Sequence, residues 1–297
     1  MPSIYEKQSD SLIIQSLFAQ RRYYTYAKIW TCAYFVVCVL LVSVFAILKA
    51  YYKCDFVTGL SIGLSIAVMF AASFINEFVD RNKKNAAEIQ QYIDVSLFAE
   101  KGSSCNNWQS PLTKNRIMEI VSSFPKNGFC ENDKWYEDYS TKSFNNQVVL
   151  CQKENIRWDK DLRGWYKYFC LALLIVAIVT IFCIGLINNP SLLEVLGFIS
   201  WILPFVKYCS SFYKRMEQDE KKLKEMNDFA DSLVELDFDN NPNAINDLIK
   251  LQNEIFEHRK KAVLIPNKFF GFFHHSFQKR EENIAENFRG ENHDTRD

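Results

Sequence analysis

Four long apolar runs divide an otherwise charged chain, and they limit its fold more than any other feature. The first three runs contain no charged residue, and about 20 such residues are enough for a helix to cross the hydrocarbon core of a bilayer. The fourth contains Glu194 and Lys207, each near an end where its charge can reach the interface. The sequence therefore predicts an all-α polytopic membrane protein with four transmembrane helices and cytosolic helical extensions. The runs are residues 29–48, 56–76, 168–187 and 192–212.

Lysine and arginine lie mostly on one side of these runs and predict their orientation. Basic residues precede the first and third runs and follow the second and fourth, whereas NNPS between the last two runs has none. Because cytoplasmic loops are enriched in Lys and Arg, both termini are expected in the cytoplasm. The predicted parts are a cytosolic N-terminal helix (1–27), transmembrane helices 1 and 2 (28–77), a cytosolic helical region and linker (78–166), transmembrane helices 3 and 4 (167–213) and a cytosolic C-terminal helical region (214–297).

Helical periodicity continues into the charged parts of the chain. The second run is expected to extend past Glu77 as one helix, and a short helix is expected to begin at Ser110 and Pro111. Two more helices, joined by the turn DNNPNA, are expected after the fourth run. The predicted buried stripes are Ala86, Ile89, Ile93 and Leu97 in the first case and Met216, Leu223, Met226, Ala230 and Leu233 after the fourth run.

Composition argues against several classes of function. The chain has 35 Lys+Arg and 35 Asp+Glu, so no overall positive field favours a DNA or RNA duplex. Its nine cysteines include no CxxC pair, which argues against a disulfide framework or a zinc site. Four histidines occur without an HExxH motif, a serine elbow or a phosphate loop. We therefore expect no catalytic residues, no metal and no cofactor.

The segment CQKENIRWDKDLRGWY, which starts at Cys151, combines charge and aromatic rings directly before the third run. Pairs four residues apart and an interfacial belt of aromatic and basic residues account for much of this pattern. In a second interpretation, Arg157, Trp158 and Arg163 face a cytosolic pocket. There guanidinium groups would bind phosphate and the indole would stack on a base.

Small residues recur at every fourth position of the second run. They would let another helix approach closely, either from the same chain or from another copy. Ser61 and Ser65 lie elsewhere on this helix, where they could face a wet lumen. The small residues are Gly59, Gly63, Ala67 and Ala71.

Four blocks of sequence, taken in order, carry a family resemblance. They are AQRRYYTYAK from Ala19, AAEIQQYIDVSLF from Ala86, CQKENIRWDKDLRGWY from Cys151 and LQNEIFEHRKKAVLIPNKFF from Leu251. Together with the four runs, they resemble the SMODS-associated four-transmembrane effector family. The chain departs from that pattern at Gln90-Gln91, where the family often has Gln-Glu, and at Lys153, where it has Arg.

This resemblance implies an antiphage effector of a CBASS system in the bacterial inner membrane. In such systems a partner nucleotidyltransferase makes a cyclic oligonucleotide, and the effector, expected to be a homo-oligomer, then breaches the bilayer through pores. A constitutive ion channel or transporter subunit, and a membrane anchor that recruits partners, are the alternatives. The candidate ligand-binding residues in the matching blocks are Arg21, Gln152, Asn155, Arg157, Trp158, Arg163 and Arg259.

Overall fold

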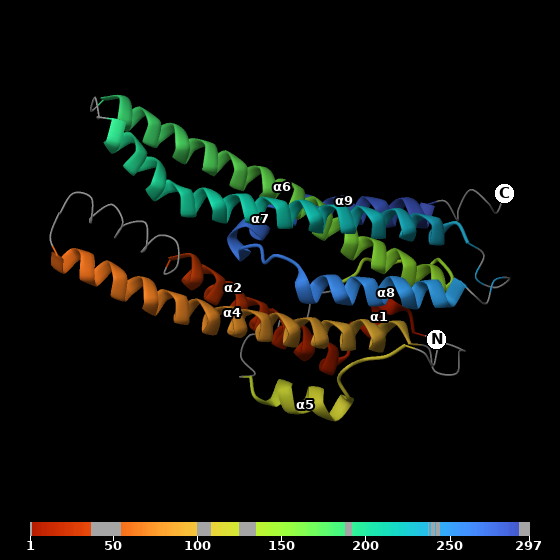
Figure 1. Ribbon diagram of the computed structural model, residues 1–297. Coiled ribbons are helices and arrows are strands. Elements are labelled where there is room, and N and C mark those ends of the chain that lie inside the picture. The colour runs from red at the N-terminus through yellow and green to blue at the C-terminus, as the bar shows by residue number, and fades with distance from the viewer. Residues whose placement is uncertain are drawn as a thin grey trace.

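The computed structural model describes residues 2–36, 55–99, 108–124, 135–187, 192–236, 238, 241 and 244–290. This part of the chain is helical and contains no strand, which confirms the predicted all-α class (Figure 1). The helices are α1 (Ile4–Lys7), α2 (Ser11–Phe35), α4 (Asp55–Phe98), α5 (Lys114–Ser122), α6 (Phe144–Ile187), α7 (Leu192–Val234), α8 (Ala244–Lys261) and α9 (Asn267–Gly290).

The three longest helices are α4, α6 and α7, and α4 and α6 contain no proline that would interrupt their hydrogen-bonded ladders. The polar stretch after Glu77 belongs to α4, as predicted, and α6 joins the charged segment at Cys151 to the apolar run without a break. At 44 residues each, α4 and α6 are about 66 Å long at 1.5 Å per residue. Helix α7 continues through Pro204, the residue that a broken transporter helix would use as its break.

The start of α5 differs from the prediction for a local reason. Ser110 Oγ accepts from the Leu112 amide at 3.2 Å, which closes a turn before the helix. Thr113 is the N-cap instead, since its Oγ1 accepts from the Arg116 amide at 3.3 Å. The helix therefore begins at Lys114.

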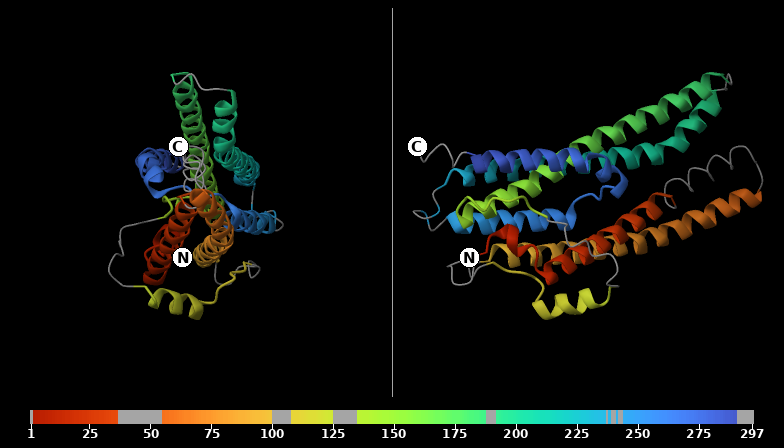
Figure 2. Two further views of the ribbon diagram at one scale, coloured as in Figure 1. Left: turned by 60° about the vertical axis from the view of Figure 1, so that its left-hand side comes forward. Right: turned by 180° about the vertical axis from the view of Figure 1, so that it is seen from behind.

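The helices form two pairs, α2 with α4 and α6 with α7, which diverge toward one end of the molecule (Figures 1 and 2). Helix α8 lies between the pairs at the other end, where it contacts α4 on one side and α6 and α7 on the other. Helix α9 contacts α6, and α5 contacts α2. The position of α8 therefore couples the two pairs.

The buried core confirms both apolar stripes. The four α4 residues and the five α7 residues that were predicted to face inward are all at most 2% exposed. Apart from Ala86 and Met216, they belong to one hydrophobic cluster with residues of α2, α5, α6 and α8, and Met216 lies in a second cluster with Leu162, Ile265 and Phe277. Burial of residues spaced three and four apart is what orients these helices.

The predicted membrane spans, unlike the buried stripes, are not confirmed. Within the described ranges, no helix is long and apolar enough to cross a membrane. The first predicted span lies outside the described residues from residue 37 to its end, and the other three lie within α4, α6 and α7. The four transmembrane helices therefore stay a prediction.

Candidate functional site

A buried carboxylate, Asp94 of α4, is the centre of a polar network between helices. Asp94 is 0% exposed and accepts hydrogen bonds from Tyr136 Oη at 2.7 Å, Gln252 Nε2 at 2.9 Å and Arg259 Nη1 at 2.5 Å. Burial lowers the pKa of Arg259, but Asp94 more than offsets this and holds that pKa above its ordinary value. Arg259 therefore stays charged, and its contact with Asp94 attaches α8 to α4.

Gln252 extends this network from α4 to α6. Its side-chain amide donates to Gln91 Oε1 as well as to Asp94, at 2.9 Å in each case. Its Oε1 accepts from Gln152 Nε2 at 3.1 Å, and the same Gln152 nitrogen lies 3.2 Å from the carbonyl oxygen of Leu248. A single buried glutamine of α8 is thus bonded to both helix pairs.

Asn155 belongs to the same network. Its Nδ2 donates to Tyr136 Oη at 2.6 Å, and its Oδ1 accepts from Trp135 Nε1 at 3.0 Å. Burial and the adjacent Asp94 raise the pKa of Tyr136, so its hydroxyl keeps the proton that it donates to Asp94. Three of the seven predicted ligand residues, Gln152, Asn155 and Arg259, are thus brought together around Asp94.

Arg163 is the centre of a second cluster, which joins α6, α7 and the end of α8. Its side chain is 6% exposed, and Nη1 donates to Asp219 Oδ2 at 2.8 Å and to the Val263 carbonyl at 2.9 Å. Its Nε lies 2.9 Å from Asp159 Oδ1, whose second oxygen lies 3.1 Å from His258 Nε2. Burial alone would raise the pKa of Asp159, but Arg163 and His258 lower it below its ordinary value.

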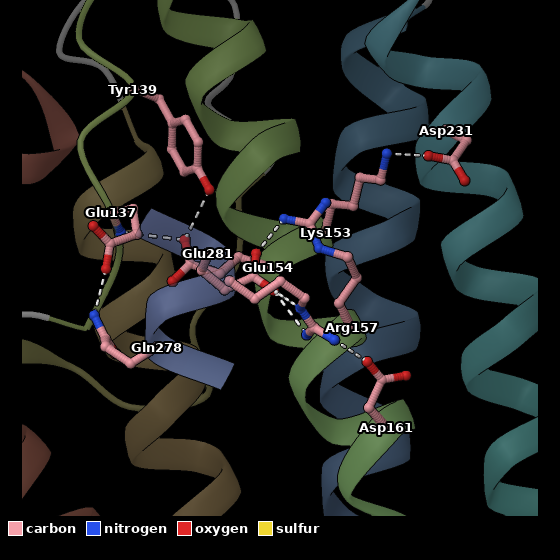
Figure 3. A network of polar contacts seen from close by, with 10 residues as sticks. Glu137, Tyr139, Lys153, Glu154, Arg157, Asp161, Asp231, Gln278 and Glu281 are labelled. Atoms are coloured by element: carbon pink, nitrogen blue, oxygen red, sulfur yellow. Dashed lines mark hydrogen bonds and ion pairs between the residues drawn. The ribbon is translucent and has the colours of Figure 1, made fainter. Parts of the chain in front are cut away.

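Arg157 attaches α6 to α9 (Figure 3). It forms an ion pair with Glu281, whose side chain is 1% exposed, and Arg280 pairs with the same carboxylate at 2.9 Å. Arg280 also pairs with Asp161 of α6. The charged segment before the third apolar run therefore binds α9 through carboxylate and guanidinium groups from both helices.

Glu154 lies in the same region without a cationic partner among its described hydrogen bonds (Figure 3). It is 5% exposed, and its Oε2 accepts from the Glu137 amide and from Tyr139 Oη, each at 3.2 Å. Burial raises the pKa of Glu154 from 4.5 to about 8. The carboxyl group is therefore mostly protonated at neutral pH.

This protonation makes stability depend on pH. Between about pH 4.5 and pH 8, the unfolded chain releases the Glu154 proton while the folded chain retains it, so stability falls as pH rises. In Glu154→Gln this contribution is absent, and we expect the variant to gain stability relative to the parent on going from pH 5 to pH 8. Urea unfolding in detergent at both pH values measures this. An equal difference in stability between the variant and the parent at pH 5 and at pH 8 would contradict this prediction.

The indole of Trp158 is covered by α9. Its ring lies 5.7 Å from that of Phe270, 5.5 Å from His274 and 5.4 Å from Phe277, measured between centroids. The predicted stacking surface for a base is therefore occupied by these rings. Arg21, in contrast, lies on an exposed part of α2.

Most of the small residues on the predicted stripe of α4 are exposed in this structure. Gly59, Gly63 and Ala67 are exposed, Ala71 is partly buried, and no described atom lies within 4 Å of a Cβ built on either glycine. The described chain therefore does not use the two glycines for internal packing. Of the predicted lumen residues, the side chains of Ser61 and Ser65 lie outside the described part.

A cavity of about 780 Å³ lies elsewhere, between α2, α4 and α5. Its lining includes Lys7, Lys114, Tyr92 and Phe124, and none of the predicted ligand residues lines it. In the described ranges, no group of three or more His, Cys, Asp or Glu side chains could hold a metal ion. The polar clusters of α8 therefore remain the place where predicted site residues meet.

Sequence reasoning missed the distant acidic partners of the arginines, whereas the pair of Asp159 with Arg163, four residues apart, is confirmed at 2.9 Å. Asp94 directly follows Ile93 of the buried α4 stripe, and Glu281 lies between Phe277 and Ala285, which are both buried on α9. An acidic residue at a position where helical periodicity requires burial is a recognisable signal, because such a charge needs a cation nearby.

Known proteins provide an independent comparison. A family described as the SMODS-associating 4TM effector domain matches residues 2–288. A probable CBASS effector molecule of Bacillus cereus (strain VD146) is 24% identical over 193 residues, and the match covers 62% of this chain and 62% of that relative's length. No solved structure matches. Because the family match covers almost the whole chain, as the four sequence blocks predicted, the protein belongs to the SMODS-associating 4TM effector family.

Proposed function

We propose that the protein is a CBASS effector that senses a cyclic oligonucleotide and then breaches the bacterial inner membrane. The family and the name of the Bacillus cereus relative support the effector role, and with it a partner nucleotidyltransferase. One observation carries the sensing role. Arg163 and Arg259 hold α8 between the helix pairs, and each is neutralised by a carboxylate that a phosphate could replace.

The exposed surface of α6 supports a membrane location. Leu173, Ile175, Ile178 and Val179 are between 44% and 53% exposed, and on a helix these positions point in several directions. Leaving apolar surface in water costs about 25 cal/mol per Å², a cost that hydrocarbon removes. With the distribution of Lys and Arg, this supports spans whose cytoplasmic ends lie at the helical part that contains α8.

The energy available from phosphate binding is sufficient for gating. Driving a closed-to-open equilibrium from 1:99 to 99:1 requires about 5.5 kcal/mol of differential binding. Hydrogen bonds to charged groups contribute about 1.5–3 kcal/mol each, so two to four phosphate contacts beyond those that replace the carboxylates would suffice. We propose that phosphates take the place of Asp94 and Asp219 on the two arginines. Because α8 contacts both pairs, its release would let α2 and α4 move relative to α6 and α7.

The opening itself is proposed to need several copies. The exposed stripe of Gly59 and Gly63 supports a contact between α4 and another copy, since small residues allow close approach in a membrane. Ser61 and Ser65 would then face the lumen. This action is a conformational change and involves no catalysis.

The first test is leakage of an encapsulated dye from liposomes that contain the purified protein. Cyclic di- and trinucleotides are added one at a time, and we expect leakage with one of them and none without ligand. Linear hydrolysis products of the active nucleotide are the control. Leakage without any ligand would favour a constitutive channel, and no leakage under any condition would exclude the proposed breach.

A further inference from the structure

Exposed aromatic rings of two helices lie together where α9 begins. We call Trp165, Tyr168 and Phe169 of α6 with Phe272 of α9 the α6–α9 aromatic patch. These side chains are 57%, 60%, 47% and 83% exposed, respectively. Isolated exposed apolar residues are normal, but several exposed aromatic rings on two helices that pack together mark a surface that binds something.

Ring contacts hold the first turns of α9 on α6. Phe273 stacks on Trp165 with centroids 5.5 Å apart and an interplanar angle of 22°. The ring of Phe269 lies 5.4 Å from that of Phe169, tilted by 44°. On the helix Phe272 lies to one side of the face that Phe269 and Phe273 turn toward α6, and its side chain is 83% exposed. The patch is therefore a fixed feature of the fold.

The surroundings of the patch identify its partner. On α6, exposed apolar residues such as Leu173 and Val179 continue directly from the patch. On α9, the face of Phe272 becomes polar within one or two turns, at the exposed residues His275, Ser276 and Lys279. The apolar surface thus continues along α6 and ends along α9, as at the boundary between hydrocarbon and headgroups.

We propose that the α6–α9 aromatic patch binds the headgroup–acyl boundary of a phospholipid bilayer, with Phe272 among the outer acyl carbons. Aromatic rings favour this depth because they combine apolar area with tolerance of a polar environment. The proposal rests on the membrane location proposed above. It adds that α9 is anchored to lipid in its second turn, at Phe272, and to α6 at Glu281, through Arg157.

Quenching by brominated lipid tests this proposal. Phe272→Trp is reconstituted as the full chain into phosphatidylcholine vesicles with and without bromine on the acyl chains, and the emission of the parent protein is subtracted. We expect the added emission to be quenched, as that of Leu173→Trp on α6 should be. Asn283→Trp is the matched control, because it is exposed on the same face of α9, about 16 Å further along. Its added emission should be unaffected.

The outcomes distinguish a failure of the patch proposal from a failure of the proposed membrane location. Quenching of Leu173→Trp without quenching of Phe272→Trp would overturn the patch alone. Failure of the parent protein to float with vesicles would overturn the membrane location and the patch together. Trp165→Phe provides a second measurement that introduces no new tryptophan: it should remove a quenched component from the parent emission. Unchanged quenching in that variant would count against the patch.

Discussion

Arg259→Ala is expected to destabilise the protein by about 3–5 kcal/mol, the cost of leaving a buried charge without its partner. Asp94 is 0% exposed and would retain only the neutral donors Tyr136 and Gln252. Denaturant unfolding in detergent, followed by circular dichroism, measures this. The same loss would weaken the attachment of α8 to α4.

An exposed ion pair serves as the control for the buried pair of Arg259 and Asp94. Arg116 and Glu119 of α5 are also paired, at 2.7 Å, but their side chains are 62% and 64% exposed. Arg116→Ala should therefore cost no more than about 1 kcal/mol. The double variant Asp94→Asn, Arg259→Met removes both charges, and it should recover much of the loss. An Arg259→Ala variant as stable as Arg116→Ala would refute the role assigned to this pair.

Removing Arg163 and removing its carboxylate partner are expected to have opposite effects on nucleotide-triggered leakage. Arg163→Ala deletes the proposed phosphate donor and should abolish the response while membrane insertion continues. Asp219→Asn retains an acceptor for the Val263 amide but removes a competing charge. One lost charged hydrogen bond, about 1.5 kcal/mol, should lower the nucleotide concentration for half-maximal leakage about tenfold.

Lys222 provides the control for these two variants. It pairs with Glu254 at 2.7 Å, so it also joins α7 to α8, but its side chain is 45% exposed. Lys222→Ala should leave the concentration dependence of leakage unchanged. If Asp219→Asn abolished leakage as Arg163→Ala does, both residues would serve to hold the helices together. The proposed replacement of Asp219 by a phosphate would then be wrong.

The sequence identified arginines of the candidate site, but not that each of them is paired with a distant carboxylate. Arg157, Arg163 and Arg259 were chosen because guanidinium groups bind phosphate, and all three are paired with carboxylates. Their partners Glu281, Asp219 and Asp94 lie 124, 56 and 165 positions away along the chain. No spacing rule connects residues at such separations. Whether a phosphate displaces these carboxylates stays a prediction that the leakage variants test.

The helices and their inward faces could be read from the sequence alone, because they depend on residues three or four positions apart. The stripes of α4 and α7, the continuity of α4 past Glu77 and the family resemblance all belong to this class. The tertiary structure alone decided that α8 lies between the two pairs and that Asp94 and Gln252 bond it there. Those contacts exist only when distant segments meet, since a buried charge or amide takes whichever partner packing brings within reach.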